Sequence, residues 1–438
     1  MCRPYTAQGN NDRLNMNSRL SSIKLNIFYG WYVLAASFAI LFLTSGVRFS
    51  IGVVFKPLMW EFGWNRSLIS LAFFLNMTFY AVSLIFTGKY YDRYGPKWVI
   101  IISNFFISAG FMSLAFINSF WQFLVFYGII AAIGMGGTTV PLYAAVLSKW
   151  FTKGRGLAVS LGLAGSSIGQ FILVPVLTAV VLRYGWRISY FSIGLIMLLV
   201  ISALAVFIIK GDPQDFDLKP YGHHNEEADE RNDTPNFSRI KAGDLSLADA
   251  AKTYSFWFFV TFMFICGSAD FMITTHLIPL VTDYNISPTT AGNMLAWLGL
   301  MSLVGLLIAG PASDKIGTKT PIALTFLLRF LLFTLILNFQ NQFSLYVFAC
   351  AFGITLLVTA PLNAILVGRL YGFSHVGLIS GVITTIHHLG GGFWTYMGGE
   401  VFDRTGSYRL VFIISAILAL LAILFTLAIK EKKHRVPG

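Results

Sequence analysis

Long apolar runs, each of about the length that crosses a bilayer, fill most of this 438-residue chain. The first six lie near residues 28–58, 67–88, 98–117, 121–148, 156–182 and 188–209. The second six lie near residues 253–281, 290–311, 320–338, 343–367, 377–401 and 410–429. Because a backbone surrounded by lipid must satisfy its own polar groups, each run predicts a transmembrane helix. The sequence therefore predicts an all-α polytopic membrane protein with twelve transmembrane helices.

The placement of the basic residues predicts the orientation of the chain. A net charge of +12 could indicate a nucleic-acid partner, but most of the 31 Lys and Arg residues fall in the termini and in the loops on one side. The other side has five: Arg66, Arg183, Arg187, Arg404 and Arg409. Basic loops remain in the cytoplasm. We therefore expect a multi-pass protein of the plasma (cell inner) membrane, with both termini cytoplasmic and no nucleic-acid partner.

A polar, acidic segment at residues 210–252 separates the two sets of runs. It predicts a cytoplasmic linker between a six-helix bundle at 28–209 and another at 253–429. Cytoplasmic tails at 1–27 and 430–438 complete the predicted organisation. The adjacent His223 and His224 lie in the linker, and neither a metal site nor a cofactor is predicted.

A short charged motif occurs twice, once in each half of the chain. Asp314 lies 222 residues after Asp92, and the flanking glycines and basic residues keep the same spacing. The repeat predicts a duplicated bundle, with glycines allowing tight turns and the charges at the cytoplasmic surface. We expect the two copies to gate the carrier rather than to bind substrate. Their candidate gating residues are Gly88, Asp92, Arg93, Gly95, Gly310, Asp314, Lys315 and Gly317.

This hairpin motif resembles that of the major facilitator superfamily. The stretches 28–31, 61–67, 149–158 and 184–187 are also similar to the monocarboxylate-transporter and oxalate/formate-antiporter branches. The resemblance covers nearly all of residues 28–429. It implies two six-helix halves that rock around a central cavity, in a functional monomer. The chain departs from drug/proton antiporters, which carry a Gly-Pro pair in helix 5, and from anion-transporting relatives, which usually keep an Arg in helix 8.

Ionisable residues inside the predicted spans are the first candidates for a substrate site, because each costs at least ~2.5 kcal/mol in the bilayer centre. Arg48 and Asp270 lie in spans 1 and 7, again 222 residues apart. Since the resemblance implies that these helices face the cavity, we expect the two side chains to pair across it. The alternative is a buried salt bridge that only holds the halves in register. Arg329 is expected to be structural, because the ninth helix resembles the peripheral supports of the family.

Four further residues are weaker candidates for binding substrate. His387 and His388 lie in span 11, about 100° apart around a helix, so at most one is expected to face the cavity. His387, with Asp270, is the candidate for proton coupling, since histidine titrates near pH ~6.5. Otherwise such a histidine is neutral and bonded to a helix neighbour. Tyr127 and Asn76 could donate to a carboxylate, and core packing is the alternative for both.

These features together predict a secondary transporter of a small organic anion, a monocarboxylate, by proton symport. The incoming carboxylate would displace Asp270 from Arg48, and Asp270 would then take a proton. The alternatives are an anion exchanger of the oxalate/formate type, a carrier for an uncharged or cationic solute, and a sensor with a transporter fold. The chain has no phosphate-binding loop or nucleophile motif, so we expect no enzyme. Its expected partners are the anion, a proton and membrane lipid.

Overall fold

The computed structural model describes residues 28–213, 218–222, 245–372 and 375–429, and these residues are mostly helical. Within this described part, 11 helices are long and apolar enough to cross a membrane. The first half of the chain forms α2 (Tyr29–Arg48), α3 (Ile51–Phe62), α4 (Arg66–Leu114), α5 (Phe120–Phe123), η1 (Leu124–Ala131), α6 (Ala132–Met135), η2 (Gly136–Thr138), α7 (Val140–Trp150), α8 (Arg155–Tyr184) and α9 (Trp186–Phe207). The second half forms α10 (Leu247–Ala250), α11 (Tyr254–Asp283), α12 (Pro288–Ile316), α13 (Lys319–Asn338), α14 (Gln342–Leu356), α15 (Thr359–Tyr371), α16 (Val376–Thr405) and α17 (Arg409–Ala428).

The twelve predicted spans fit these 11 helices because α4 contains two of them. Its backbone breaks at Gly95, whose φ of 74° lies in the left-handed region that favours glycine. Two antiparallel arms of α4 meet there. Gly317 ends α12 with a φ of 80° and turns the chain in the second copy of the motif. The expectation that every motif glycine is required by a turn is wrong for Gly88 and Gly310. Both lie within helices, where an added Cβ would meet nothing within 4 Å.

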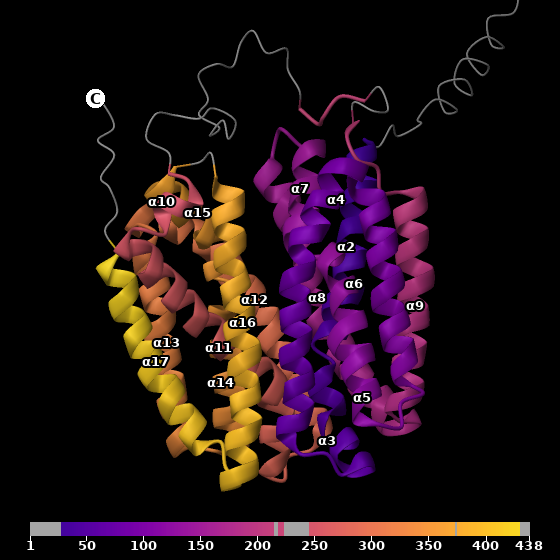
Figure 1. Ribbon diagram of the computed structural model, residues 1–438, viewed down its shortest axis with the longest axis vertical. Coiled ribbons are helices and arrows are strands. Elements are labelled where there is room, and N and C mark those ends of the chain that lie inside the picture. The colour runs from indigo at the N-terminus through magenta and orange to yellow at the C-terminus, as the bar shows by residue number, and fades with distance from the viewer. Residues whose placement is uncertain (1–27, 214–217, 223–244, 373–374, 430–438) are drawn as a thin grey trace, which may run out of the picture.

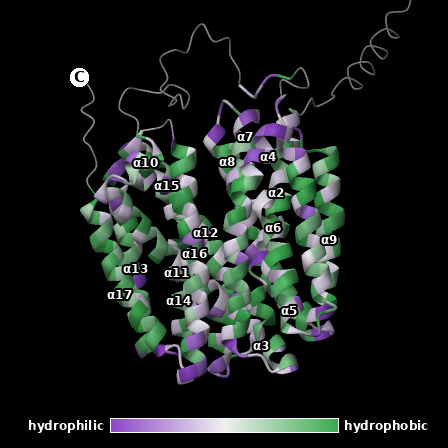
Figure 2. Cartoon of the chain, viewed as in Figure 1, coloured by the Kyte–Doolittle hydropathy of each residue, from purple (hydrophilic) through white to green (hydrophobic). Residues whose placement is uncertain are grey.

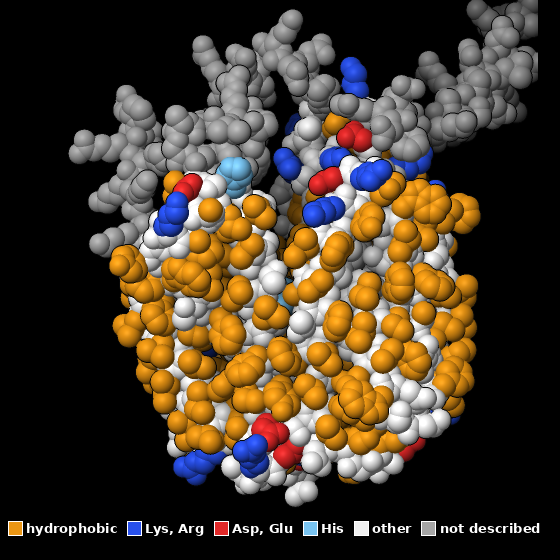
Figure 3. Space-filling view, viewed as in Figure 1, with side chains coloured by type: hydrophobic (Ala, Val, Ile, Leu, Met, Phe, Trp, Pro, Cys, Tyr) orange, Lys and Arg blue, Asp and Glu red, His pale blue; other side chains and the backbone are white. Residues whose placement is uncertain are grey.

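The helices gather into two groups that follow the order of the chain. Figure 1 shows α2 to α9 on one side and α11 to α17 on the other. Apolar residues cover the outer sides of the helices in Figure 2, and Figure 3 shows a broad hydrophobic band with charged side chains at both ends. This is the pattern of a protein whose sides face lipid and whose ends face water. The boundaries of the linker and tails stay predictions.

We name the two ends of the molecule by what lies there. The linker face is the end where α2 begins and α9 finishes, and the Tyr29 hydroxyl donates to the Ile208 carbonyl across 3.1 Å there. The opposite face is the end where α3 finishes and α4 begins. Part of the predicted linker is described at the linker face: the Tyr221 carbonyl accepts from the backbone N–H of Lys153 at 3.0 Å. His223 and His224 lie outside the described residues.

Candidate transport site

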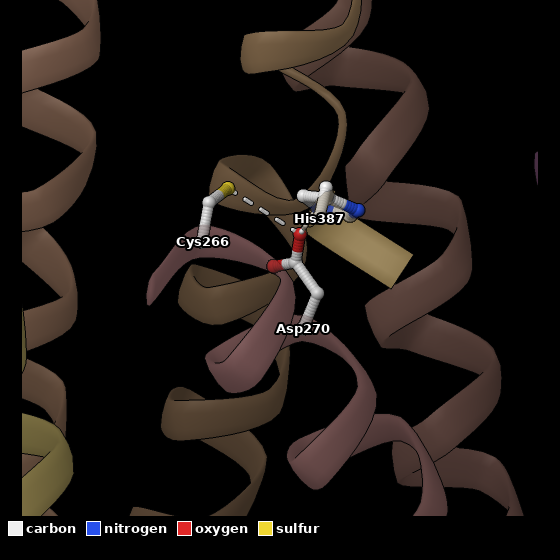
Figure 4. A group of neighbouring side chains, drawn as sticks. All are labelled: Cys266, Asp270 and His387. Carbon is white, nitrogen blue, oxygen red and sulfur yellow. Dashed lines mark hydrogen bonds and ion pairs between the residues drawn. The ribbon is translucent and has the colours of Figure 1, made fainter. Parts of the chain in front are cut away.

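Asp270 is the centre of a buried polar cluster between α11, α13 and α16. Its side chain is only 6% exposed. One carboxylate oxygen, Oδ1, accepts a hydrogen bond of 2.5 Å from Nη2 of Arg329. The other, Oδ2, lies 3.1 Å from Nε2 of His387, and Figure 4 draws this histidine beside the carboxylate. The Cys266 thiol also lies 3.5 Å from Oδ2 (Figure 4). Asp270 therefore has a permanent cation, a group that can gain or lose a proton, and a thiol as partners.

The close packing of α16 on α11 brings His387 to Asp270. Gly267 lies one turn before Asp270, and a Cβ at this position would collide with the carbonyl of His387. The Ser268 hydroxyl donates to the Gly390 carbonyl across 3.1 Å and so links the same two helices. Small residues allow this approach, as is usual where membrane helices pack closely. Gly267 therefore helps to set the position of the histidine against the acid.

Arg329 is fully buried, and most of its donors are satisfied. Besides its bond to Asp270, Nη1 donates to the Cys266 carbonyl at 3.1 Å and Nε donates to the Thr355 hydroxyl at 3.0 Å. Nη2 also reaches the Thr355 carbonyl at 3.0 Å. These bonds agree with the structural role expected for Arg329, and its bond to Asp270 also brings it to the candidate site. This arginine extends from α13 to the carboxylate on α11 and fixes it.

Cys266, Asp270 and His387 each offer a metal-ligating atom, and these atoms lie within 4.8 Å of one another (Figure 4). Thiolate, carboxylate and imidazole are ligands that Zn²⁺ accepts. The Arg329 guanidinium, however, already contacts the same carboxylate, and its Nη1 lies 3.5 Å from the Cys266 sulfur. A metal ion would face this fixed positive charge at short range. The donor set is therefore poorly suited to a metal.

Arg48 does not pair with Asp270, contrary to the expectation from their equivalent positions. Both oxygens of Asp270 are occupied, and Arg48 instead lies against aromatic rings. Its Cζ is 4.6 Å from the centroid of Tyr80 and 5.5 Å from that of Phe271. Nη1 is 3.5 Å from the Tyr80 hydroxyl, and Nε has no hydrogen-bond partner. Among the described residues no carboxylate forms an ion pair with Arg48.

The adjacent histidines of α16 point to different neighbours, as helical geometry requires. His387 reaches Asp270, whereas Nδ1 of His388 lies 2.7 Å from the Thr384 carbonyl of its own helix. The His388 ring packs 4.9 Å from that of Tyr80. Phe271 lies between the two groups, with its ring centroid 5.6 Å from His387 and 5.4 Å from His388. The rings of Phe271 and His388 therefore connect the Arg48 side of the site to the Asp270 side.

Tyr127 and Asn76 are brought to each other. The Asn76 amide donates to the backbone carbonyl of Tyr127 across 2.6 Å. Tyr127 lies in η1, a π-helical segment, and its ring stacks on that of Phe123 at 5.3 Å. Both side chains are buried. The described contacts of this pair are those of packing between η1 and α4, the alternative that the sequence left open.

The charged residues of the repeated hairpins lie far from this cluster, at the linker face. Asp92 and Asp314 are exposed, and neither forms an ion pair within the described part of the chain. Arg93 lies over the Tyr94 ring, with 5.2 Å from its Cζ to the centroid. The hairpins therefore contribute no group to the buried site, and their gating role stays a prediction.

A family model for the Major Facilitator Superfamily matches residues 37–281 and also residues 257–438 of the chain. The chain belongs to the Major Facilitator Superfamily. It is therefore a multi-pass membrane protein and a secondary transporter of a small molecule, not an enzyme. This family carries its substrates between two halves of a bundle, which agrees with the two groups of helices described above.

The relatives of this Major Facilitator Superfamily transporter cover almost its whole length. It is 26% identical over 419 residues to the uncharacterized MFS-type transporter YcxA of Bacillus subtilis, a match that covers 93% of this chain and 98% of the relative. It is 25% identical to human monocarboxylate transporter 11, covering 90% of this chain and 81% of that one. Among solved structures, it is similar to the nucleoside transporter NupG, with a TM-score of 0.71 and 12% identity, over 92% of this chain and all of that one. A bacterial homolog of the human lysosomal transporter Spinster has a TM-score of 0.69 and 14% identity, over 91% of this chain and 96% of that one.

The two halves of this Major Facilitator Superfamily protein are bonded together at the opposite face. The guanidinium of Arg66, at the start of α4, donates to Oδ1 of Asp283 and to the hydroxyl of Tyr408, both at 2.8 Å. Lys56 of α3 forms a second ion pair of 2.8 Å with Asp283. His276 supports this arrangement from α11, with Nδ1 2.7 Å from the Tyr408 hydroxyl. Arg66 was expected in a loop without a role, and it instead begins α4 and joins the two halves.

A carboxylate from the second half also caps the first arm of α4. Asp403 of α16 accepts hydrogen bonds from the backbone N–H groups of Arg66 at 3.1 Å and of Ser67 at 2.7 Å. A carboxylate at a helix N-terminus is favoured by the helix dipole. We call Lys56, Arg66, Asp283, Asp403 and Tyr408 the opposite-face lock. At the linker face, Figure 3 shows a hollow between the two halves. The opposite-face lock thus closes the molecule between its two halves at the opposite face.

Proposed function

We propose that this chain transports a small organic monocarboxylate by alternating access, with Arg48 as the ligand for the carboxylate group. The observation that carries the proposal is the environment of Arg48, a guanidinium without a carboxylate partner among the described residues. Such a charge inside the membrane is costly, and it marks a ligand or ion site. A carboxylate fits the planar fork of a guanidinium, since both of its oxygens can accept a hydrogen bond.

The charges of the site support an anionic substrate. Arg48 and Arg329 are two permanent cations within the spans, and Asp270 is the one acid bonded to either of them in the described part of the chain. One positive charge is left over when His387 is neutral. A bound carboxylate would cancel it, and the cavity could close around a site without net charge. A carrier for a cationic solute would need an excess of negative charge in its site.

The apolar lining of the site is consistent with a small organic anion. The Arg48 guanidinium lies against the rings of Tyr80 and Phe271. Met77 Sδ lies 3.8 Å from its Nη2. Because these neighbours are mostly apolar, they offer a bound substrate few polar contacts beyond the one between Arg48 and its carboxylate. Several relatives are named monocarboxylate transporters, at about a quarter identity, which agrees with this substrate class.

We propose that the proton needed for symport is held between Asp270 and His387. The carboxylate and the imidazole nitrogen are 3.1 Å apart, close enough to share it. Arg329 stabilises the acid whether or not the substrate is present, so Arg48 is not required to keep Asp270 ionised. The proton site and the anion site would communicate through Phe271, which contacts the rings of both histidines and faces Arg48.

Anion exchange is a second candidate, and the Arg329–Asp270 pair favours it. Because Arg329 already compensates Asp270, closure around a bound anion would leave no net charge when Asp270 and His387 carry no additional proton. The empty cavity would retain the unpaired charge of Arg48. Closing it without an anion would then be slow, and each anion delivered would be replaced by another on the return step.

The test is uptake and binding by the purified chain in proteoliposomes, with labelled lactate, pyruvate, formate and oxalate as probes. We expect saturable uptake of at least one of these anions. Arg48→Gln should weaken its binding about 10- to 100-fold, the loss of a hydrogen bond to a charged group. Arg48→Lys should retain part of the affinity, because the charge remains but the fork is lost. Arg409→Gln, at an exposed helix start, is the matched control.

Three results would overturn the proposal. Unchanged binding in Arg48→Gln would exclude this residue as the ligand. If the chain transports an uncharged or cationic solute, and carboxylates do not inhibit this transport, monocarboxylates are excluded as its substrates. Binding of a carboxylate without any flux would indicate a sensor instead. Uptake that rises with an inward proton gradient distinguishes symport from exchange, which instead requires an anion on the far side.

A further inference from the structure

A large apolar groove lies between the two arms of α4, away from the transport site. Its volume is about 910 Å³. The lining residues lie between Phe79 and Tyr94 on the first arm and between Trp98 and Phe106 on the second, and Ile133 of α6 is also in the wall. The side chains that line it are mostly large and apolar, and many are more than one third exposed. Because this surface belongs to membrane-spanning helices, the molecules that can enter the groove are those of the bilayer.

Glycines in α6 and η2 accompany the space between the two arms of α4. A Cβ on Gly134 would collide with the backbone of Ile107, one on Gly136 would collide with the Ser83 side chain, and one on Gly137 would collide with that of Ser103. Both arms of α4 therefore pack closely on residues 134–137, where three of the four residues are glycines and the fourth, Met135, is buried. Beside Ile133, this segment places no further side chain in the wall of the groove, and the space between the arms stays open.

Aromatic side chains form the end of the groove nearest the linker face. Tyr90 and Tyr94 are stacked, with 6.0 Å between ring centroids, and Trp98 lies one turn further along the chain. All three are more than half exposed. Tyrosine and tryptophan prefer the level of the lipid headgroups. The apolar part of the groove therefore lies at acyl-chain depth, and its aromatic end lies at the level of the phosphates.

Three basic residues are the chain neighbours of these aromatic residues, one before each of them in the sequence. Lys89, Arg93 and Lys97 lie on the hairpin that joins the two arms, and none forms an ion pair with a described residue. Arg93 is held over the Tyr94 ring. Asp92 is the one acid among residues 88–97, so the hairpin keeps a net positive charge. Clusters of this kind beside a membrane attract anionic headgroups, at ~1 kcal/mol for each basic residue.

From these features we infer that the groove is a binding site for an anionic glycerophospholipid of the surrounding bilayer. One acyl chain lies between the arms of α4, and the phosphate lies among Lys89, Arg93 and Lys97. The apolar wall alone would accept any lipid, and the three cations provide the preference for an anionic one. Because the bound lipid contacts both arms, its presence stabilises the hairpin that contains Asp92.

The experiment uses the full chain in mixed micelles with brominated lipids, which quench nearby tryptophan fluorescence. Subtracting the signal of Trp98→Phe isolates the tryptophan that lines the groove. Brominated phosphatidylglycerol should quench Trp98 at about 10-fold lower mole fraction than brominated phosphatidylcholine, as expected for two or three basic contacts partly screened by salt. Changing Lys89, Arg93 and Lys97 together to Gln should abolish this preference.

The second hairpin provides the matched control. Lys315 occupies the position that corresponds to Arg93 and is also exposed, so Lys315→Gln should leave the preference unchanged while Arg93→Gln reduces it. Equal quenching by the two lipids would overturn the proposal, as would a preference that survives the triple substitution. Competition by soluble glycerol phosphate as effective as that of the whole lipid would also overturn it, since it would indicate an anion site without a role for the groove.

Discussion

Asp270 and Arg329 form a buried ion pair, with 2.5 Å between Oδ1 and Nη2, although they lie on helices α11 and α13, 59 residues apart. The arginine side chain is fully buried and the carboxylate almost so. The acid of the transport site is therefore compensated by a cation of its own half of the molecule. Arg48, in the other half, has no acidic partner among the described residues. This division of charge underlies the proposal that Arg48 receives the anion.

The pair should be important for stability. Arg329→Gln leaves Asp270 buried without its guanidinium partner, and breaking a buried pair on one side costs ~3–5 kcal/mol. We expect a clearly lower thermal unfolding midpoint in detergent. Arg404→Gln, which breaks an exposed pair with Glu400, should cost less than ~1 kcal/mol. The double variant Asp270→Asn/Arg329→Gln should recover part of the loss, and no recovery would show that the arginine stabilises the fold by other contacts.

Most of the fold could be predicted from the sequence because the bilayer constrains it strongly. Runs of a fixed length must form helices, and charged motifs must lie at the ends. The repeat of 222 residues indicated two equivalent halves. The break at Gly95 was also accessible, since the Gly-Pro pair at 95 and 96 interrupts a helix where the charges cluster. The first span is also interrupted, because α2 ends at Arg48 and α3 begins at Ile51. No Gly-Pro pair or charge cluster marks this interruption in the sequence.

The partners inside the site could be predicted only in part. Equivalent positions in two halves fix the depth of Arg48 and Asp270, but they do not fix which side chains meet. One signal was overlooked: Arg329 is a further cation within the spans besides Arg48 and Lys56, and a buried arginine needs an acid. Its exclusion from the site followed from the position of its helix, not from its chemistry. The opposite-face lock depends on contacts between residues hundreds of positions apart, such as Arg66 with Asp403, which no local pattern reveals.

Only one histidine of α16 should affect the dependence of transport on pH, and the structure points to His387. Its imidazole contacts Asp270, whereas His388 is bonded to its own helix. Histidine changes its charge near pH ~6.5 when unperturbed. In His387→Gln the uptake–pH curve should change shape or shift, and in His388→Gln it should overlay that of the parent. Measuring both curves with the same proteoliposome preparation checks this, and two unchanged curves would remove histidine from the coupling mechanism.

The opposite-face lock should control access from that face. Asp283→Asn weakens the bonds of both Lys56 and Arg66, which join the first half to the second. Loss of such charged contacts should raise the population of the form open at the opposite face about 10-fold. A cysteine at the buried Thr275 would report this through its rate of labelling by a membrane-impermeant maleimide.

Arg187→Gln provides the control for the lock. Arg187 bonds Glu61 at the same face, but both residues belong to the first half. It should therefore leave the labelling rate of the cysteine at position 275 unchanged. If Asp283→Asn labels no faster than the parent, these ion pairs do not hold the closed state.

The hairpin motif should influence the rate of transport and not the affinity. Asp92 is exposed at the linker face, away from Asp270 and Arg48, so Asp92→Asn removes no group that could contact the substrate. We expect a lower turnover with an equilibrium affinity within a few fold of the parent. Asp314→Asn tests the second copy in the same way. Normal turnover with a large loss of affinity would contradict a gating role for the hairpins.

The most direct test of the central claim, that Arg48 holds the carboxylate while Asp270 and His387 hold the proton, is to measure proton-driven accumulation and counterflow side by side in Asp270→Asn. Both assays use the carboxylate that the parent transports, and Asp270→Asn/Arg329→Gln is included so that loss of folding is recognised. We predict that Asp270→Asn still exchanges the carboxylate but no longer accumulates it when an inward proton gradient is imposed. Accumulation against a concentration gradient, driven by protons alone in this variant, would contradict the claim.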